Sequence, residues 1–304
     1  MRRFAVRRSD WVASRSEGKD LPVGEHASHI TSEIVGPVGI VRLERPEKLN
    51  AVTYQMIADL RTHIETAAAD ARVAGIVITG TGRGFCAGLD LEDLARTTQT
   101  GVGSGDAGSP GVTPAAPSDR DELPALFSYI LRVPKPVIAA VNGVAAGGGF
   151  VLAMMCDLRF AATNGGSFTT AFSKRGLIAE HGTSWLLPRL VGTNRALDLL
   201  WSARRIDAAE AFRMGFVDRL VADEQLLDES CAYIRDLAAN VSPRSMARMK
   251  ALVYRGWSAP IDVALREVDA EMNDALTHPD AAEGVASFVE RRPPAFLPWT
   301  GGMQ

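Results

Sequence analysis

Residues 137–156 of this 304-residue chain read VIAAVNGVAAGGGFVLAMMC, and the order of features in this stretch predicts the fold. Val137–Val141 is an uninterrupted apolar run, which is typical of a strand buried on both faces of a parallel sheet. Three glycines at 147–149 then open an apolar helix over residues 150–156, and Leu158–Ala162 is a further buried strand. Strands that alternate with helices in this way predict an α/β architecture.

The flanking sequence extends this pattern in both directions. Residues 30–35 and 38–44 alternate apolar and polar side chains around Gly36-Pro37, which predicts a hairpin. Residues 53–71 carry apolar side chains at helical spacing, and residues 73–79 form another buried strand. From about residue 223 the pattern becomes helical nearly to the end. We therefore expect an α/β core at 29–221 and a helical region at 222–304.

Two segments differ in composition from the rest of the chain. Residues 1–28 are basic and lack an apolar core, so we expect a flexible tail rather than a secretory signal. Residues 98–122 are rich in glycine and proline with almost no large apolar side chains. Such a stretch buries too little surface to order itself, so we expect a mobile insertion that shapes access to a site.

Composition excludes several classes of partner. The net charge is −3, so no strong positive field is available to hold nucleic acid or an anionic membrane surface. The longest apolar runs fall far short of a membrane span. Three cysteines without a CxxC pair, and histidines without ligand spacing, indicate neither a disulfide framework nor a metal site. We expect a cytoplasmic protein that binds no metal.

A first glycine pattern suggests a dinucleotide site but does not fit one. Gly80 and Gly82 follow a buried strand, as in the fingerprint of dinucleotide-binding folds. That fingerprint requires a third glycine at position 85, where this chain has Phe85. We therefore do not expect a nicotinamide or flavin cofactor.

Two other glycine turns indicate an anion site. Residues 86–90 (CAGLD) and the triple glycine each follow a predicted strand and present backbone N–H groups at its end. Free N–H groups and the helix dipole favour negative charge where a helix begins. Two such turns facing one another would stabilise an oxyanion. The same glycines could equally serve close packing of a helix on a strand.

Five blocks of this sequence resemble the crotonase (enoyl-CoA hydratase/isomerase) superfamily. They occur in the family's order between about residues 29 and 296: RPEKLNA (45–51), GFCAGLDL (84–91), PKPVIAAVNG (134–143), GGGFVLAMMCD (147–157) and DAAEGVASF (280–288). The resemblance implies a spiral of ββα units, a C-terminal helical trimerisation region and a homotrimer or hexamer. It also implies a coenzyme A thioester as substrate and no separate cofactor.

The resemblance also assigns roles to individual residues. The backbone N–H groups of Leu89 and Gly148 would hold the thioester oxygen as it becomes an enolate. Coenzyme A would lie against Lys48, Leu49 and Ala51.

The acid positions bear on which reaction the chain catalyses. Hydratases of this family use two glutamates, and the matching positions here are Val151 and Phe172, which cannot transfer a proton. We expect both to be pocket walls. Glu180 stands where enoyl-CoA isomerases of the family carry an acid. One carboxylate suffices to move a proton from C2 to C4, and an apolar pocket would raise its pKa.

Each candidate residue has a simpler interpretation. Glu180 could pair with Arg175 or Arg189, and His181 beside it could point away from the site. For Asp90 we favour a structural role at the turn. Two cysteines in apolar company are interpreted as small core residues: Cys86 and Cys156. Met154 and Met155 lie on an apolar helix and are also interpreted as core.

The sequence thus favours a 3-enoyl-CoA to 2-enoyl-CoA isomerase in which Glu180 is the proton shuttle. One alternative is an enoyl-CoA hydratase or another lyase of the family that uses Glu180 together with a second group. An alternative of another class is an acyl-CoA-binding protein with little activity.

Overall fold

The computed structural model describes residues 28–100 and 123–299, and within them the strands form two sheets. The larger sheet has the order β1 (Ile30–Val35), β2 (Val38–Leu43), β3 (Gly75–Gly80), β5 (Val137–Val141), β7 (Leu158–Ala162) and β10 (Arg219–Val221). β1 and β2 form the antiparallel hairpin that the sequence predicted, and the other neighbours are parallel. The smaller sheet has the order β4 (Gly84–Cys86), β6 (Val144–Ala146), β8 (Ser167–Thr169) and β9 (Ile206–Asp207).

Successive segments contribute one strand to each sheet, which makes the chain a spiral of repeated ββα units. β3 is followed by β4 and then by α2 (Leu91–Thr100), and β5 is followed by β6 and then by α3 (Gly148–Met155). β7 and β8 repeat the pattern. β3, β5 and β7 are parallel neighbours, and so are β4, β6 and β8. The predicted ββα spiral is therefore confirmed.

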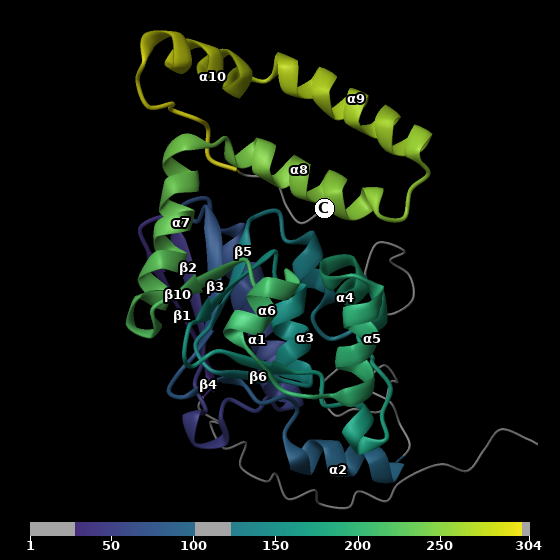
Figure 1. The fold of residues 1–304 in the computed structure, drawn as a ribbon. Helices are drawn as coiled ribbons and strands as arrows, with labels where there is room; N and C mark the ends of the chain where they lie inside the picture. Colours follow the sequence, from purple (N-terminus) through teal and green to yellow (C-terminus); the bar gives the residue numbers. More distant parts are fainter. Residues whose placement is uncertain (1–27, 101–122, 300–304) are drawn as a thin grey trace, which may run out of the picture.

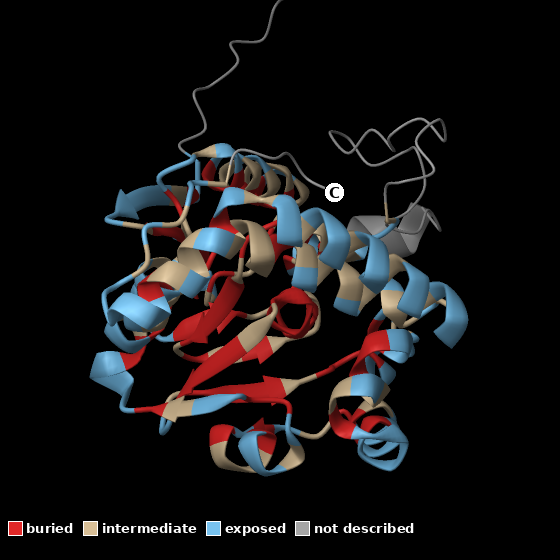
Figure 2. Cartoon of the chain, turned by 90° about the horizontal axis from the view of Figure 1, so that it is seen from above, coloured by how far each residue is buried: buried red, intermediate tan, exposed pale blue. Residues whose placement is uncertain are grey.

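Helices surround the sheets and then continue away from them. Those within the spiral are α1 (Tyr54–Ala69), α4 (Thr183–Val191), α5 (Thr193–Ser202) and α6 (Ala208–Met214). The C-terminal helices are α7 (Leu226–Asn240), α8 (Pro243–Gly256), α9 (Ile261–Thr277) and α10 (Pro279–Glu290). Figure 1 shows α9 and α10 in a layer beyond α8, on the side away from the sheets. Figure 2 shows buried strands enclosed by helices whose outer faces are exposed.

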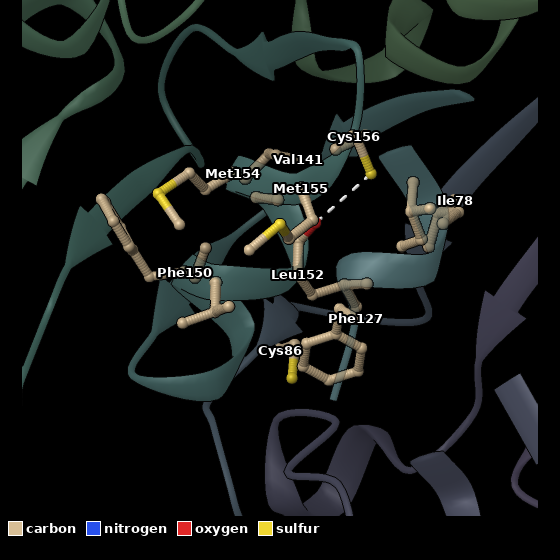
Figure 3. Close-up of a cluster of buried hydrophobic side chains, with 14 of the residues drawn as sticks. Ile78, Cys86, Phe127, Val141, Phe150, Leu152, Met154, Met155 and Cys156 are labelled. Atoms are coloured by element: carbon tan, nitrogen blue, oxygen red, sulfur yellow. Dashed lines mark hydrogen bonds between the residues drawn. The ribbon is translucent and has the colours of Figure 1, made fainter. Parts of the chain in front are cut away.

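The hydrophobic core lies between the two sheets and around α3. Every residue of β3 and β5 is buried, which explains their continuous apolar sequence. Figure 3 shows the side chains of Cys86, Met154, Met155 and Cys156 within this apolar cluster. Burial raises the pKa of both the Cys86 and the Cys156 thiols to about 12. These four residues are core, as the sequence predicted.

The C-terminal region is joined to the spiral through a half-buried carboxylate that sequence reasoning missed. Asp157 lies just after α3, and its Oδ2 accepts from the Val137 N–H at 2.7 Å and from Lys250 Nζ at 2.7 Å. Its Oδ1 accepts from the Tyr254 hydroxyl at 2.9 Å. Lys250 and Tyr254 both belong to α8. The Asp157 side chain thus connects β5 of the larger sheet to α8.

The predicted boundaries can be compared with the observed ones. The strands at 137–141 and 158–162 have the predicted limits, and the helix predicted at 53–71 spans Tyr54–Ala69 with Thr53 as its N-cap. The tail predicted at 1–28 lies outside the described residues except for its last residue. The insertion predicted at 98–122 also lies outside them, except that residues 98–100 form the end of α2.

Candidate active site

The two glycine turns predicted to hold an anion face one another. Gly88 has φ +104°, and a Cβ added there would lie 2.8 Å from the Ala146 carbonyl oxygen and 3.4 Å from the Gly148 nitrogen. A Cβ added at Gly148 would lie 3.6 Å from the Leu89 nitrogen. The N–H groups of Leu89 and Gly148 are therefore neighbours, although they come from different ββα units.

Both N–H groups are available to a ligand. Gly148 is the first residue of α3, so its N–H has no acceptor within the helix. Leu89 forms an isolated parallel bridge with Val52, in which Val52 donates to the Gly88 carbonyl and Asp90 donates to the Val52 carbonyl. In such a bridge the N–H of the central residue points away from the partner strand. The Leu89 N–H thus points away from Val52.

The three glycines at 147–149 have different roles. The pattern serves both the anion site and the close packing of a helix on a strand. Gly147 has φ +51° and ψ −116°, a conformation open mainly to glycine. A Cβ at Gly149 would lie 1.9 Å from the Cys86 carbonyl oxygen, so this glycine permits α3 to pack against β4. Only Gly148 faces the opposite turn. Close packing by Gly149 is what brings the Gly148 N–H to the Leu89 N–H.

A cavity of about 870 Å³ opens at these two turns. It is lined by most of the residues that the sequence singled out: Lys48, Ala51, Leu89, Asp90, Gly148, Phe172, Arg175, Glu180 and His181. Residues from four separate segments of the chain therefore meet in one place. We call this space the catalytic cavity.

The segment expected to bind coenzyme A is held in an unusual backbone conformation. Leu49 and Asn50 have φ values of +50° and +57°. The Asn50 side chain is fully buried, accepts from the Arg45 N–H at 2.8 Å and donates to the carbonyls of Thr81 and Gly84 at 2.9 and 2.7 Å. These bonds fix the edge of the cavity. Lys48 and Ala51 line it, whereas Leu49 is not among its described lining residues.

Glu180 lies at the rim of the catalytic cavity, in the turn that precedes α4. Its side chain is 46% exposed, whereas the sequence led us to expect an apolar enclosure. The difference arises because residues 176–182 belong to neither a strand nor a helix and cross the surface. Glu180 Oε1 lies 3.3 Å from Nε2 of His181, whose side chain is only 9% exposed. The two side chains therefore form a pair that faces the cavity, and His181 does not point away from the site.

The two arginines considered as partners of Glu180 have other contacts. The Arg189 guanidinium lies 4.0 Å from the centre of the Trp185 ring and donates to the Trp185 carbonyl. Arg175 donates to the Ala171 carbonyl at 3.1 Å and lines the cavity. Arg175 is thus a cation beside the site to which the sequence analysis gave no role in binding.

The two family acid positions lie in different environments. Phe172 is 7% exposed and lines the cavity, as expected of a pocket wall. Val151 is fully buried within the core cluster and is not among the described residues that line the cavity. No carboxylate stands at either position.

Two further carboxylates line the cavity. Asp90 Oδ2 accepts from Arg45 Nη1 at 2.6 Å, and its Oδ1 accepts from the Glu92 N–H at 2.9 Å. The Glu92 N–H and Arg45 together hold the pKa of Asp90 below its usual value. Asp90 therefore caps the start of α2, which matches the structural role favoured above. Glu92 is an exposed acid at the cavity that sequence reasoning missed.

In residues 28–100 and 123–299, no group of three or more His, Cys, Asp or Glu side chains is arranged to hold a metal ion. None of the helices in these ranges is long and apolar enough to span a membrane.

The comparison with family models identifies the class of protein. Residues 33–298 match the model described as enoyl-CoA hydratase/isomerase. The chain therefore belongs to the enoyl-CoA hydratase/isomerase family, within the crotonase superfamily, and is an enzyme of that family. The resemblance noted in the sequence is confirmed.

Individual relatives carry names for more than one reaction. The chain is 35% identical to a probable enoyl-CoA hydratase of Rhodobacter capsulatus, over 88% of this chain and 97% of that protein. It is 34% identical to the 1,2-epoxyphenylacetyl-CoA isomerase of Escherichia coli, with the same coverage. The crystal structure of an enoyl-CoA hydratase from Mycobacterium tuberculosis superposes with a TM-score of 0.77 at 28% identity, covering 89% of this chain and 99% of that one.

Proposed function

We propose that this enzyme converts a 3-enoyl-CoA into the 2-enoyl-CoA, with Glu180 as the proton shuttle. The observation that carries the proposal is the set of groups at the catalytic cavity. Glu180 shares the cavity with the Leu89 and Gly148 N–H groups, while the hydratase acid positions hold Val151 and Phe172. A site that lacks a carboxylate at both hydratase acid positions suits isomerisation better than addition of water.

The proposed reaction uses these groups in sequence. The Leu89 and Gly148 N–H groups bind the thioester oxygen and stabilise the negative charge that develops there. The Glu180 carboxylate removes a proton from C2, which forms a dienolate with double bonds at C1–C2 and C3–C4; the double bond moves to C2–C3 only when C4 is protonated. The carboxylic acid of Glu180 then returns the proton at C4 and the carbonyl is restored. Atoms and charge balance, and no water is consumed.

His181 supports Glu180 in this scheme. Its Nε2 lies 3.3 Å from Glu180 Oε1, and this contact orients the carboxylate toward the cavity. Phe172 covers another part of the cavity and limits access of water to the double bond. The half-exposed Glu180 would be shielded further when the acyl group fills the cavity.

The pairing of Glu180 with His181 is also the observation that favours a second candidate. Two adjacent proton-transfer groups could activate water and deliver the α-proton, as a hydratase requires. The relatives named as probable hydratases are consistent with this alternative.

The test is to supply the purified enzyme with a 3-enoyl-CoA and the matching 2-enoyl-CoA. We expect double-bond migration without hydration, and a loss of kcat of about 100-fold or more in Glu180→Gln. Glu92→Gln is the matched control, because it removes another carboxylate at the same cavity and should retain activity. Hydration of the 2-enoyl-CoA would identify the hydratase. Binding of both esters without turnover of either would indicate an acyl-CoA-binding protein.

We further propose that the enzyme assembles as a homotrimer or as a hexamer of two trimers. The support is a set of large apolar side chains left exposed by α9 and α10: Ile261, Leu265, Met272, Leu276, Phe288 and Val289. Many large exposed apolar side chains on neighbouring helices are typical of an interface. Light scattering of the purified protein gives the assembled mass directly.

A further inference from the structure

A second cavity adjoins the catalytic cavity and has no role in the scheme above. It has a volume of about 480 Å³ and lies between α8 and the spiral. We call it the distal pocket, and its apolar wall consists of Leu131, Val133, Met155, Trp185, Ala251 and Tyr254.

The two cavities meet at His181, which lines both. They also share the segment before β5, since Leu126 and Phe127 line the catalytic cavity and Ser128 lines the distal pocket. An acyl chain that extends from the thioester past Glu180 and His181 would therefore run toward the distal pocket.

The distal pocket is apolar but carries positive charge without acidic residues among its described lining. Two of its cations are already neutralised. Lys250 Nζ lies 2.7 Å from Asp157 Oδ2, and Arg255 Nη1 lies 3.0 Å from Glu267 Oε1. The third, Arg132, is half-buried and makes no ion pair with any residue that the structure describes.

A guanidinium on the pocket wall that no described carboxylate neutralises is available to an anionic ligand. The planar guanidinium matches a carboxylate particularly well, because it can donate two parallel hydrogen bonds. The apolar wall selects a hydrocarbon chain, and Arg132 selects an anionic group at the end of that chain.

We propose that the distal pocket binds the far end of the acyl group, and that Arg132 pairs with a terminal carboxylate there. The preferred substrate class is thus a long-chain acyl-CoA that carries an ω-carboxylate. The inference rests on the proposed function in one respect only, that the catalytic cavity holds the thioester.

The test measures binding rather than turnover, so that it does not depend on the role of Glu180. Isothermal titration compares a saturated long-chain acyl-CoA with its ω-carboxyl counterpart of equal length. We expect the ω-carboxyl ester to bind about tenfold more tightly, the typical effect of a hydrogen bond between charged groups. Arg132→Met should abolish this preference and Arg132→Lys should retain part of it.

Arg255→Met is the matched control, because it removes a cation of the same pocket that already has a partner. We expect it to leave the preference unchanged. Equal affinity of wild type for the two esters, or an equal loss in Arg132→Met and Arg255→Met, would overturn the role of Arg132.

A second variant tests the pocket itself. Ala251 is half-buried on the pocket wall, so Ala251→Phe should fill the space. We expect weaker binding of long-chain esters and unchanged binding of butyryl-CoA, with circular dichroism as a check on folding. A change in assembled mass without a change in chain-length preference would contradict the proposal and mark the pocket as an interface. If wild type binds esters of neither length, the proposed function fails, and this inference with it.

Discussion

The spiral and the outer C-terminal helices use apolar side chains in opposite ways. Every residue of β3 and β5 is buried, whereas α9 has no buried residue. Ile261 on α9 is 75% exposed and Phe288 on α10 is 85% exposed. The spiral completes its own core, and the outer helices do not. The chain therefore contains both a region that buries its apolar side chains and a region that leaves many of them exposed.

The two regions also differ in what holds them in place. α3 is fixed by backbone packing that tolerates no additional atom, because a Cβ at Gly149 would overlap the Cys86 carbonyl. α8 is held to the spiral by the polar contacts of Asp157 with Lys250 and Tyr254. Substitutions in the spiral should consequently affect folding most strongly, and those in the outer helices should affect assembly.

The largest effect is expected for Gly149→Ala. The added methyl group would lie 1.9 Å from a backbone oxygen, so α3 or β4 must move, and the Leu89 and Gly148 N–H groups must separate. We expect a loss of about 4 kcal/mol or more in the free energy of unfolding, measured by urea denaturation. Gly256→Ala is the control, because nothing lies within 4 Å of its added Cβ. Equal stability of the two variants would refute tight packing at Gly149.

A smaller loss is expected for Asp157→Asn. The substitution leaves the half-buried Lys250 ammonium without its anionic partner, and loss of a hydrogen bond between charged groups costs about 2 kcal/mol. Asp262→Asn provides the comparison, since the Arg266–Asp262 pair on α9 is largely exposed and should contribute less than about 1 kcal/mol. Both values come from urea denaturation. If the two variants lose the same stability, Asp157 does not anchor α8.

A pH effect is expected from Lys135, whose Nζ donates to the Asp70 carbonyl at 2.6 Å beneath α1. Burial lowers its pKa to about 8 from the ordinary value of 10.5. Between these values the unfolded chain binds the proton and the folded chain does not. Stability should therefore rise with pH in this window.

The measurement for Lys135 is the urea midpoint of wild type and of Lys135→Met at pH 7.5 and pH 10. The difference between the two proteins should shift in favour of wild type at the higher pH. Buried thiols titrate in both proteins alike and cancel in this comparison. A difference that stays constant with pH would show that Lys135 keeps its proton in the folded state.

The smallest effect on folding is expected for Phe288→Glu on α10. Its side chain is 85% exposed, so the free energy of unfolding of the isolated chain should change by no more than about 0.5 kcal/mol. The assembled mass seen by light scattering should fall, because a charge would enter the proposed interface. Asp269→Lys on the exposed surface of α9 serves as the control. An unchanged mass in Phe288→Glu would place the interface elsewhere.

The sequence predicted best those elements whose residues form a recognisable pattern along the chain. The strands at 137–141 and 158–162 are continuous apolar runs, and their limits were predicted to the residue. β4, β6 and β8 have three residues each, which is too short for a period to be detected. The second strand of each ββα unit therefore emerged only from the structure.

The candidate site likewise has some features that the sequence predicted and others that only the structure shows. The glycine turns and the absence of acids at Val151 and Phe172 are properties of the sequence itself. The positions of Glu92, Arg175 and Arg132 beside the cavities have no local signal, because a single charged residue on a loop or near a helix end is common. Only the cavities in which they lie mark them as candidates.

The sequence by itself determined the α/β class, the family and the residue types that could hold an enolate. These follow from the local pattern of apolar runs and glycines, which the chain carries wherever it folds. The tertiary structure alone decided that Gly148 and Leu89 meet, that Glu180 pairs with His181 at an exposed rim, and that a second cavity opens beyond it. Those relations depend on how separate ββα units stack, and stacking is set by packing between residues far apart in the chain.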